Sequence, residues 1–113
     1  MYVKGKELKK GLNDERRNIA VVGTRKVTKF GKSACEKIVR ELLEYEVTLI
    51  SGLAEGIDTV ALSASVEKDG SAIAVVGSGL DIVYPYENKI LWEKISENGI
   101  LISEHPLGTK PLK

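Results

Sequence analysis

Four short apolar runs alternate along the chain with longer segments in which polar and apolar residues are mixed. The runs are Ile19–Gly23, Val47–Ser51, Ala72–Val76 and Ile100–Ser103. Short runs that are apolar almost throughout are typical of strands covered on both faces, as in a parallel sheet. The pattern therefore predicts an α/β protein in which these strands pair in parallel.

The segments between the runs predict helices. From about residue 32 to 45, apolar residues recur at helical spacing and form a stripe: Ala34, Ile38 and Leu42, with Cys35, Val39 and Leu43 beside them. A second helix is expected to begin at Asp58, whose side chain would cap it, and to end near Gly70. A third is expected from about residue 87 to 98, before Gly99.

With right-handed crossovers, this order predicts a Rossmann-like three-layer sandwich with a mostly parallel sheet. At 113 residues the chain is long enough for one domain but short for a complete sheet of this kind. We interpret residues 1–18 as a basic lead-in segment and residues 19–113 as a partial Rossmann-like domain. An uncovered sheet edge beyond 100–103 is then expected to promote self-association, through that edge or the adjacent apolar helix face.

Three of the predicted strands end in loops that contain glycine. The loops are Val21-Val22-Gly23-Thr24-Arg25-Lys26, Ser51-Gly52-Leu53-Ala54-Glu55-Gly56-Ile57-Asp58 and Val75-Val76-Gly77-Ser78-Gly79-Leu80-Asp81. The carboxyl ends of parallel strands meet at one edge of the sheet, and ligands bind in the crevice there. Small residues let a ligand approach the backbone, and helix N-termini favour anions. These loops therefore indicate a phosphate-binding edge.

The formal net charge of +1 hides an uneven distribution. Residues 1–40 contain twelve Lys and Arg against four Asp and Glu, a balance of +8, whereas residues 41–113 contain five against twelve, a balance of −7. The cations beside the first glycine loop are Arg25, Lys26, Lys29 and Lys32. Such a patch attracts a polyanion, and a solvated lysine-rich surface is the alternative interpretation.

Two glycine motifs resemble nucleotide-binding fingerprints but are incomplete. Gly31-Lys32-Ser33 lacks the glycine that a P-loop carries five residues earlier, where this chain has Lys26. Gly77-Ser78-Gly79 lacks the third glycine of a dinucleotide fingerprint, where this chain has Ile82. We therefore expect no nucleotide cofactor, although a small nucleotide- or anion-binding domain stays open as an alternative.

Residues that could carry catalysis are few. His105 is the only histidine, so two-histidine metal motifs are excluded, and it is either a loop residue or a ligand contact. Asp81 is expected to orient the turn that precedes Tyr84. The only cysteine, Cys35, lies on the apolar stripe of the first predicted helix and fits the core of a protein in a reducing cytoplasm. We expect no catalytic residues and no metal.

Taken together and in order, the loop sequences resemble the DNA-processing protein A (DprA, also called Smf) family. The matching strings are Val22-Gly23-Thr24-Arg25, Ser51-Gly52-Leu53-Ala54, Gly56-Ile57-Asp58, Gly79-Leu80-Asp81-Ile82-Val83-Tyr84-Pro85, Glu87-Asn88 and Ser103-Glu104, followed by Pro106, Gly108 and Thr109. The resemblance implies a bacterial cytoplasmic protein that is not an enzyme and uses no cofactor. It also implies that the protein acts as a dimer, binds single-stranded DNA, and helps to load the RecA recombinase in DNA uptake and recombination during natural transformation.

By this resemblance Arg25 holds the DNA, and Gly23, Gly52 and Gly56 are glycines of the pocket. A planar guanidinium suits a phosphate group, which agrees with that role. The complete set of nucleic-acid-binding residues that we predict is Gly23, Thr24, Arg25, Lys26, Lys29, Lys32, Gly52, Leu53, Gly56, Asp58, Ser78 and Gly79.

Aromatic residues near the loops could stack on bases, and Phe30, Tyr84 and Tyr86 are the candidates, each with core packing as the alternative. The chain departs from the family pattern at Leu62, where the family usually has histidine, and at His105, where it often has tyrosine. The resemblance also implies that the Rossmann-like domain is truncated on its C-terminal side, before the final strands that complete the family's sheet. An enzyme on the same scaffold, such as a phosphoribohydrolase of the lysine-decarboxylase-like group, is a further alternative. Its proline-glycine-glycine-x-glycine-threonine loop does not occur in this sequence.

Overall fold

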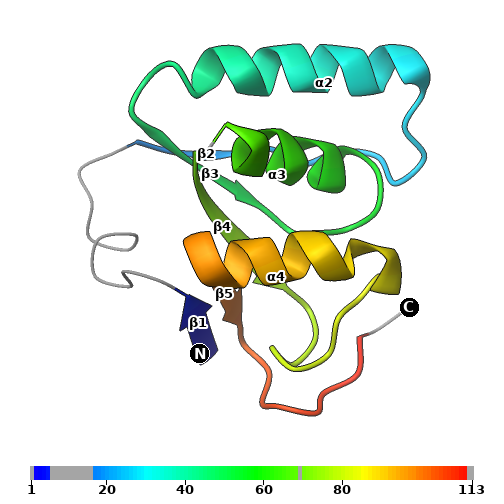
Figure 1. Ribbon diagram of the computed structural model, residues 1–113. Helices are drawn as coiled ribbons and strands as arrows, with labels where there is room; N and C mark the ends of the chain where they lie inside the picture. Colours follow the sequence, from blue (N-terminus) through cyan, green and yellow to red (C-terminus); the bar gives the residue numbers. More distant parts are fainter. Residues whose placement is uncertain (1, 6–16, 69, 112–113) are drawn as a thin grey trace.

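The computed structural model describes residues 2–5, 17–68 and 70–111 (Figure 1). In chain order the elements are β1 Tyr2–Gly5, β2 Arg17–Ala20, α2 Lys29–Leu42, β3 Val47–Ser51, α3 Ile57–Glu67, β4 Ser71–Val76, the 3-10 helix η1 Tyr86–Asn88, α4 Lys89–Asn98 and β5 Ile100–Ser103. All of the predicted strands and helices are present, so the α/β class is confirmed, but the first strand, predicted over residues 19–23, ends at Ala20 and begins two residues earlier than predicted.

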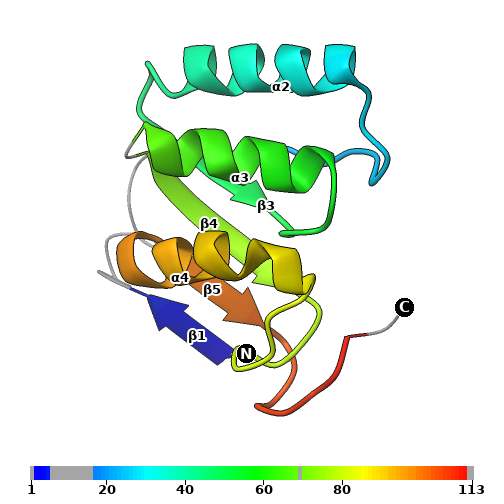
Figure 2. The same ribbon diagram turned by 45° about the vertical axis from the view of Figure 1, so that its right-hand side comes forward.

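The described strands form one sheet in the order β1-β5-β4-β3-β2. Strands β2 to β5 are parallel, and β1 joins β5 in the antiparallel sense. From β2 to β5, each strand lies next to the one before it in the sequence, always on the same side. Because right-handed crossovers that proceed in one direction place their helices on the same face, all three helices are expected on one face of the sheet. Figures 1 and 2 show α2, α3 and α4 side by side on that face. The described residues make up two layers of the predicted sandwich.

Strand β1 corrects the interpretation of the N-terminal segment. Residues 2–5, predicted as lead-in, form an edge strand, and β2 begins at Arg17, before the predicted domain boundary. The rest of that lead-in, residues 6–16, lies outside the described residues. Because Val3 pairs with Ile102, the edge of β5 is occupied, and the prediction of an uncovered edge there was wrong. No local pattern marks this pairing, since its two strands lie at opposite ends of the sequence.

Apolar side chains are buried on both faces of the sheet. Fully buried residues between the sheet and the helices include Val39, Leu49, Leu62, Ile95 and Leu101. On the opposite face, Ile73, Ile100 and Ile102 form a second buried cluster. In β3 and β5, burial of both faces is the physical reason why the strands are apolar almost throughout, whereas the edge strand β2 is mostly exposed.

Helix α3 lies at the centre of the helix layer, in contact with α2, α4, β3 and β4. A helix covered on several sides is expected to carry buried residues around its circumference, and α3 buries Val60, Ala61, Leu62 and Ala64. Its C-terminal end follows the prediction, because the N–H of Gly70 donates to the carbonyl oxygen of Ser65 at 2.8 Å.

Helix α2 starts earlier than predicted and faces a different way. The Thr28 hydroxyl caps it by accepting a hydrogen bond from the N–H of Gly31 at 3.0 Å, so the helix begins at Lys29. Its buried residues are Cys35 and Val39, whereas Ile38, predicted on the buried stripe, is 56% exposed. The difference arises because α2 lies at the end of the helix layer and packs mainly against α3.

The third helical segment follows the prediction. The 3-10 turn η1 begins directly after Pro85 and continues into α4, which buries Trp92 and Ile95. The helix ends where the N–H of Gly99 donates to the carbonyl oxygen of Ile95 at 2.7 Å. Within the described part of the chain, no helix has the length and apolar character that crossing a membrane requires.

Cys35 is buried, as predicted, and its Sγ lies 4.0 Å from the carbonyl oxygen of Ile57. Burial raises the pKa of the thiol, and the negative charges of Glu36 and Asp58 raise it further. Because the thiolate is the reactive form, we expect an aromatic disulfide reagent to modify Cys35 slowly in the folded protein and rapidly in urea. Equal rates in the two conditions would show that α2 does not shield this residue.

Candidate nucleic-acid interface

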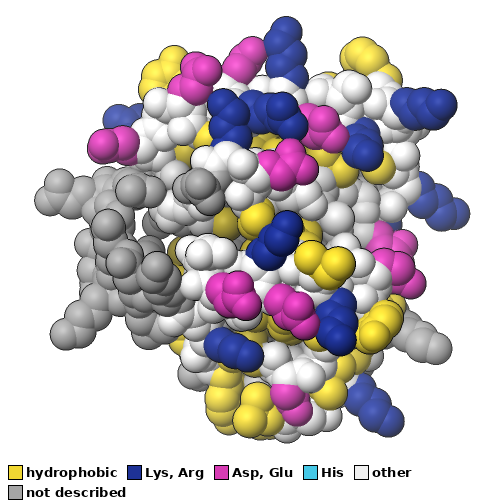
Figure 3. All heavy atoms as spheres, viewed as in Figure 1, with side chains coloured by type: hydrophobic (Ala, Val, Ile, Leu, Met, Phe, Trp, Pro, Cys, Tyr) yellow, Lys and Arg dark blue, Asp and Glu magenta, His cyan; other side chains and the backbone are white. Residues whose placement is uncertain are grey.

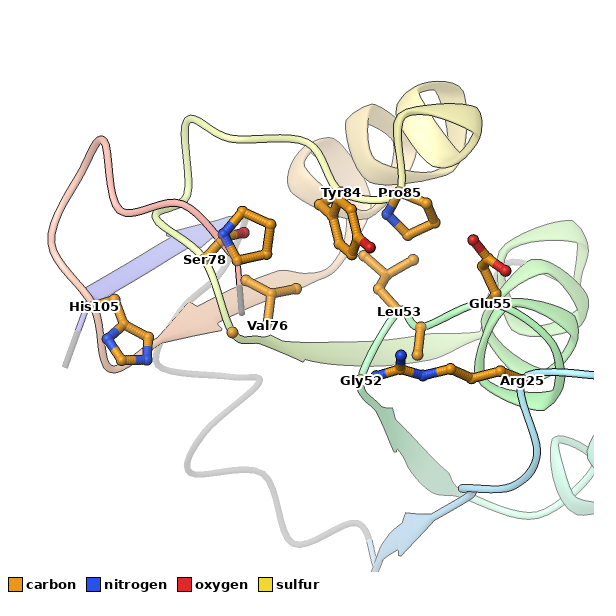
Figure 4. Close-up of a pocket in the computed structure, with 12 residues that line it drawn as sticks. Arg25, Gly52, Leu53, Glu55, Val76, Ser78, Tyr84, Pro85 and His105 are labelled. Atoms are coloured by element: carbon orange, nitrogen blue, oxygen red, sulfur yellow. The ribbon is translucent and has the colours of Figure 1, made fainter. Parts of the chain in front are cut away.

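A cleft of about 270 Å³ lies at the carboxyl ends of the parallel strands. Its lining residues come from the loops after β2, β3, β4 and β5: Arg25, Gly52, Leu53, Ala54, Glu55, Val76, Gly77, Ser78, Tyr84, Pro85, His105 and Pro111. Figure 4 shows Arg25 and His105 at opposite ends of the cleft. The predicted ligand edge is therefore a hollow in the described part of the molecule.

The loop after β2 is held against the start of α3. The N–H of Ile57 donates to the carbonyl oxygen of Thr24 at 3.0 Å, and the Thr24 hydroxyl accepts from the N–H of Lys26 at 3.1 Å. A Cβ at Gly23 would lie 2.8 Å from the Ile57 side chain, so only glycine fits this close approach. The Arg25 side chain extends from this loop toward Gly52 (Figure 4).

The loop after β3 is held by its own side chains. Asp58, which was predicted to cap α3, instead accepts a hydrogen bond at Oδ2 from the N–H of Gly52 at 3.1 Å, and Gly56 is the N-cap residue. The Asn88 amide donates to the carbonyl oxygen of Leu53 at 3.3 Å and to the Thr59 hydroxyl at 2.8 Å. These contacts hold Leu53 in the left-handed conformation, with φ of 57°.

The loop after β4 is tied to the loop after β5. The Ser78 hydroxyl donates to the carbonyl oxygen of Ile82 at 3.0 Å. The N–H of Gly79 donates to the carbonyl oxygen of Thr109 at 2.9 Å. Asp81 was predicted to orient its own turn, but its Oδ1 accepts from the N–H of Gly108 at 2.7 Å. The side chains of Ser78 and Asp81 therefore stabilise the edge of the cleft from within the protein.

The predicted site residues divide into three groups. Four of them line the cleft: Arg25, Gly52, Leu53 and Ser78. A second group holds the loops in place: Gly23, Thr24, Gly56, Asp58 and Gly79. The third group is exposed and lies outside the cleft lining: Lys26, Lys29 and Lys32. Contact of any of these residues with DNA stays a prediction.

Several lining residues were missing from the predicted set. Among them are Glu55, Gly77 and His105, which lie within four residues of the end of a predicted strand. That position in the sequence is the signal that could have identified them. Of the aromatic candidates, Tyr84 lines the cleft, whereas Phe30 and Tyr86 lie outside its lining and are 83% and 69% exposed.

The charges around the cleft are mixed. Arg25 and Glu55 both belong to the lining, and Figure 4 shows the Glu55 carboxylate pointing away from the Arg25 guanidinium. On the helix face, Lys and Arg side chains are interspersed with Asp and Glu (Figure 3). Within the described ranges, no group of three or more His, Cys, Asp or Glu side chains could hold a metal ion.

A family model of DNA recombination-mediator protein A matches residues 1–113. The chain belongs to the DprA family. It is 44% identical over 95 residues to DNA processing protein DprA of Streptococcus pneumoniae, covering 84% of this chain and 33% of that protein. It is 43% identical over 93 residues to protein Smf of Synechocystis, covering 82% of this chain and 23% of that protein.

Two solved DprA structures share this fold. The DprA structure from S. pneumoniae matches with a TM-score of 0.89 at 40% identity, over 98% of this chain and 38% of that one. A Helicobacter pylori DprA, described for its single-stranded DNA binding mode, matches with a TM-score of 0.86 at 29% identity, over 99% of this chain and 49% of that one. The chain thus spans less than half the length of these DprA relatives.

Proposed function

We propose that this chain binds single-stranded DNA through the cleft at the carboxyl edge of its sheet. The observation that carries the proposal is the position of Arg25, whose exposed side chain lines a hollow walled by loops with internal hydrogen bonds. Loops that are held in position before the ligand arrives lose little conformational freedom on binding. A phosphate oxygen is the group that a guanidinium fork in such a hollow suits.

The proposal includes no catalytic step and no cofactor. On the basis of family membership, we further propose that the bound strand serves DNA uptake and recombination in the cytoplasm, and that it is passed to the RecA recombinase during natural transformation. If so, adding this chain should speed RecA assembly on strands already covered by a single-strand-binding protein. An unchanged assembly rate would separate DNA binding from recombinase loading.

The test of the proposed function is a titration of the wild-type chain with a labelled oligothymidylate and with thymidine monophosphate as competitor. Two or three neutralised phosphates would give a logarithmic salt slope of about −1.4 to −2.1. Competition by the mononucleotide at equal phosphate concentration would favour the alternative, a small nucleotide- or anion-binding domain. Absence of binding to either ligand would contradict both proposals.

We also propose that the chain self-associates through the outer side of α2. Phe30 and Ile38 are exposed on this helix at 83% and 56%. A symmetric contact with a second copy would cover both of them.

We expect light scattering to show concentration-dependent dimers that Ile38→Ser abolishes. The matched control is Ile90→Ser on α4, which replaces an isoleucine that is 69% exposed. A monomer at all concentrations, or equal effects of the two substitutions, would contradict an α2 interface.

A further inference from the structure

Gly77 is a glycine that the fold does not require. Of the ten glycines in the described part of the chain, two would carry a Cβ with nothing within 4 Å, Gly77 and Gly108. Gly108 has φ of +83°, a conformation that favours glycine, whereas Gly77 is outside the positive-φ set. At Gly77, neither backbone conformation nor neighbouring atoms exclude a side chain.

The location of Gly77 suggests why a residue without a side chain is found there. Gly77 directly follows β4, is exposed, and lines the cleft together with Arg25. Among the described residues, no hydrogen bond joins the N–H groups of Gly77 and Ser78 to a backbone or side-chain acceptor; Ser78 is only 2% exposed, but it lines the cleft. Adjacent backbone N–H groups that are free in this way are suited to an anion, and a glycine allows the anion to come close.

We propose that Gly77 is a ligand-contact residue, where a phosphodiester of the bound strand lies against the backbone and accepts hydrogen bonds from the N–H groups of Gly77 and Ser78. This inference rests on the proposed function, since it assigns a second phosphate contact to the cleft that contains Arg25. Arg25 reaches the cleft from the loop after β2, and Gly77 belongs to the loop after β4. The strand would therefore run across the ends of the parallel strands.

The decisive variant is Gly77→Ala, which adds one methyl group to empty space beside the cleft. We expect the melting temperature to equal or exceed that of the wild type, because alanine restricts the unfolded chain more than glycine does. We expect affinity for the labelled oligothymidylate to fall about tenfold or more, since an inserted methyl group disrupts a close contact. The matched control is Gly31→Ala at the start of α2, outside the cleft lining, which should leave the affinity unchanged.

A second measurement detects the backbone N–H groups of Gly77 and Ser78 directly. In an ¹⁵N-labelled wild-type chain titrated with the same oligothymidylate, the amide signals of Gly77 and Ser78 should move strongly. Wild-type affinity in Gly77→Ala, unmoved signals at both residues, or unfolding of the variant would each overturn the inference while leaving the proposed function intact. Failure of the wild type to bind the oligonucleotide would instead show that the proposed function itself is wrong.

Discussion

Arg25→Ala is expected to weaken single-stranded DNA binding by about 10-fold to 150-fold. The physical reason is the loss of one charge-assisted contact in the cleft, a change of about 1.5–3 kcal/mol. The logarithmic salt slope should also become shallower by about 0.7, because one fewer phosphate is neutralised. Fluorescence anisotropy of the labelled oligothymidylate at several salt concentrations measures both quantities.

The matched control for this variant is Arg17→Ala. Arg17 is also an exposed arginine of the β2 segment, but it lies at the amino end of the strand, away from the cleft. We expect its removal to change affinity far less than removal of Arg25 does. Equal losses from the two substitutions would indicate diffuse electrostatic attraction and would contradict a specific site at Arg25.

Gly56→Ala is expected to lower the free energy of unfolding by about 2–4 kcal/mol. The reasons are that alanine disfavours the left-handed backbone of this residue and that its methyl group overpacks a close contact. Gly56 has φ of 82°, and an added Cβ would collide with the backbone of Thr24 and Arg25. Relief of that collision requires the Arg25 loop to shift, so DNA affinity should fall as well. Urea unfolding measures the stability, and the anisotropy titration measures the affinity.

A suitable comparison is Gly31→Ala, in which the added Cβ meets the Val27 side chain at 3.2 Å within a helical turn. Alanine is favoured over glycine in a helix, so this variant should unfold at nearly the wild-type urea concentration. A similarly small effect of Gly56→Ala would show that the loops after β2 and β3 do not pack together as described.

The helices, the parallel strands and the edge of the sheet where the cleft lies could be predicted from the sequence alone. The ranges predicted for β3 and β5 agree with the structure, because a strand buried on both faces has a continuous apolar run that glycine or polar residues end. The end of α4 at Gly99 could also be predicted, because a glycine ends a helix through contacts with residues close to it in the sequence. Arg25 could be placed at the ligand edge because parallel strands end on the same side of a sheet.

How the helices, strands and loops contact one another became clear only from the folded structure. Asp58 could be placed beside the cleft from the sequence, but not its hydrogen bond to Gly52, because capping and loop contacts are equally open to an aspartate at a helix start. Ile38 is exposed because α2 lies at the end of its layer, a position that helical spacing does not encode. Strand β1 pairs with residues at the other end of the chain, and the cleft forms from four separate loops. Contacts between distant segments depend on the packing of the whole chain, and no local pattern specifies them.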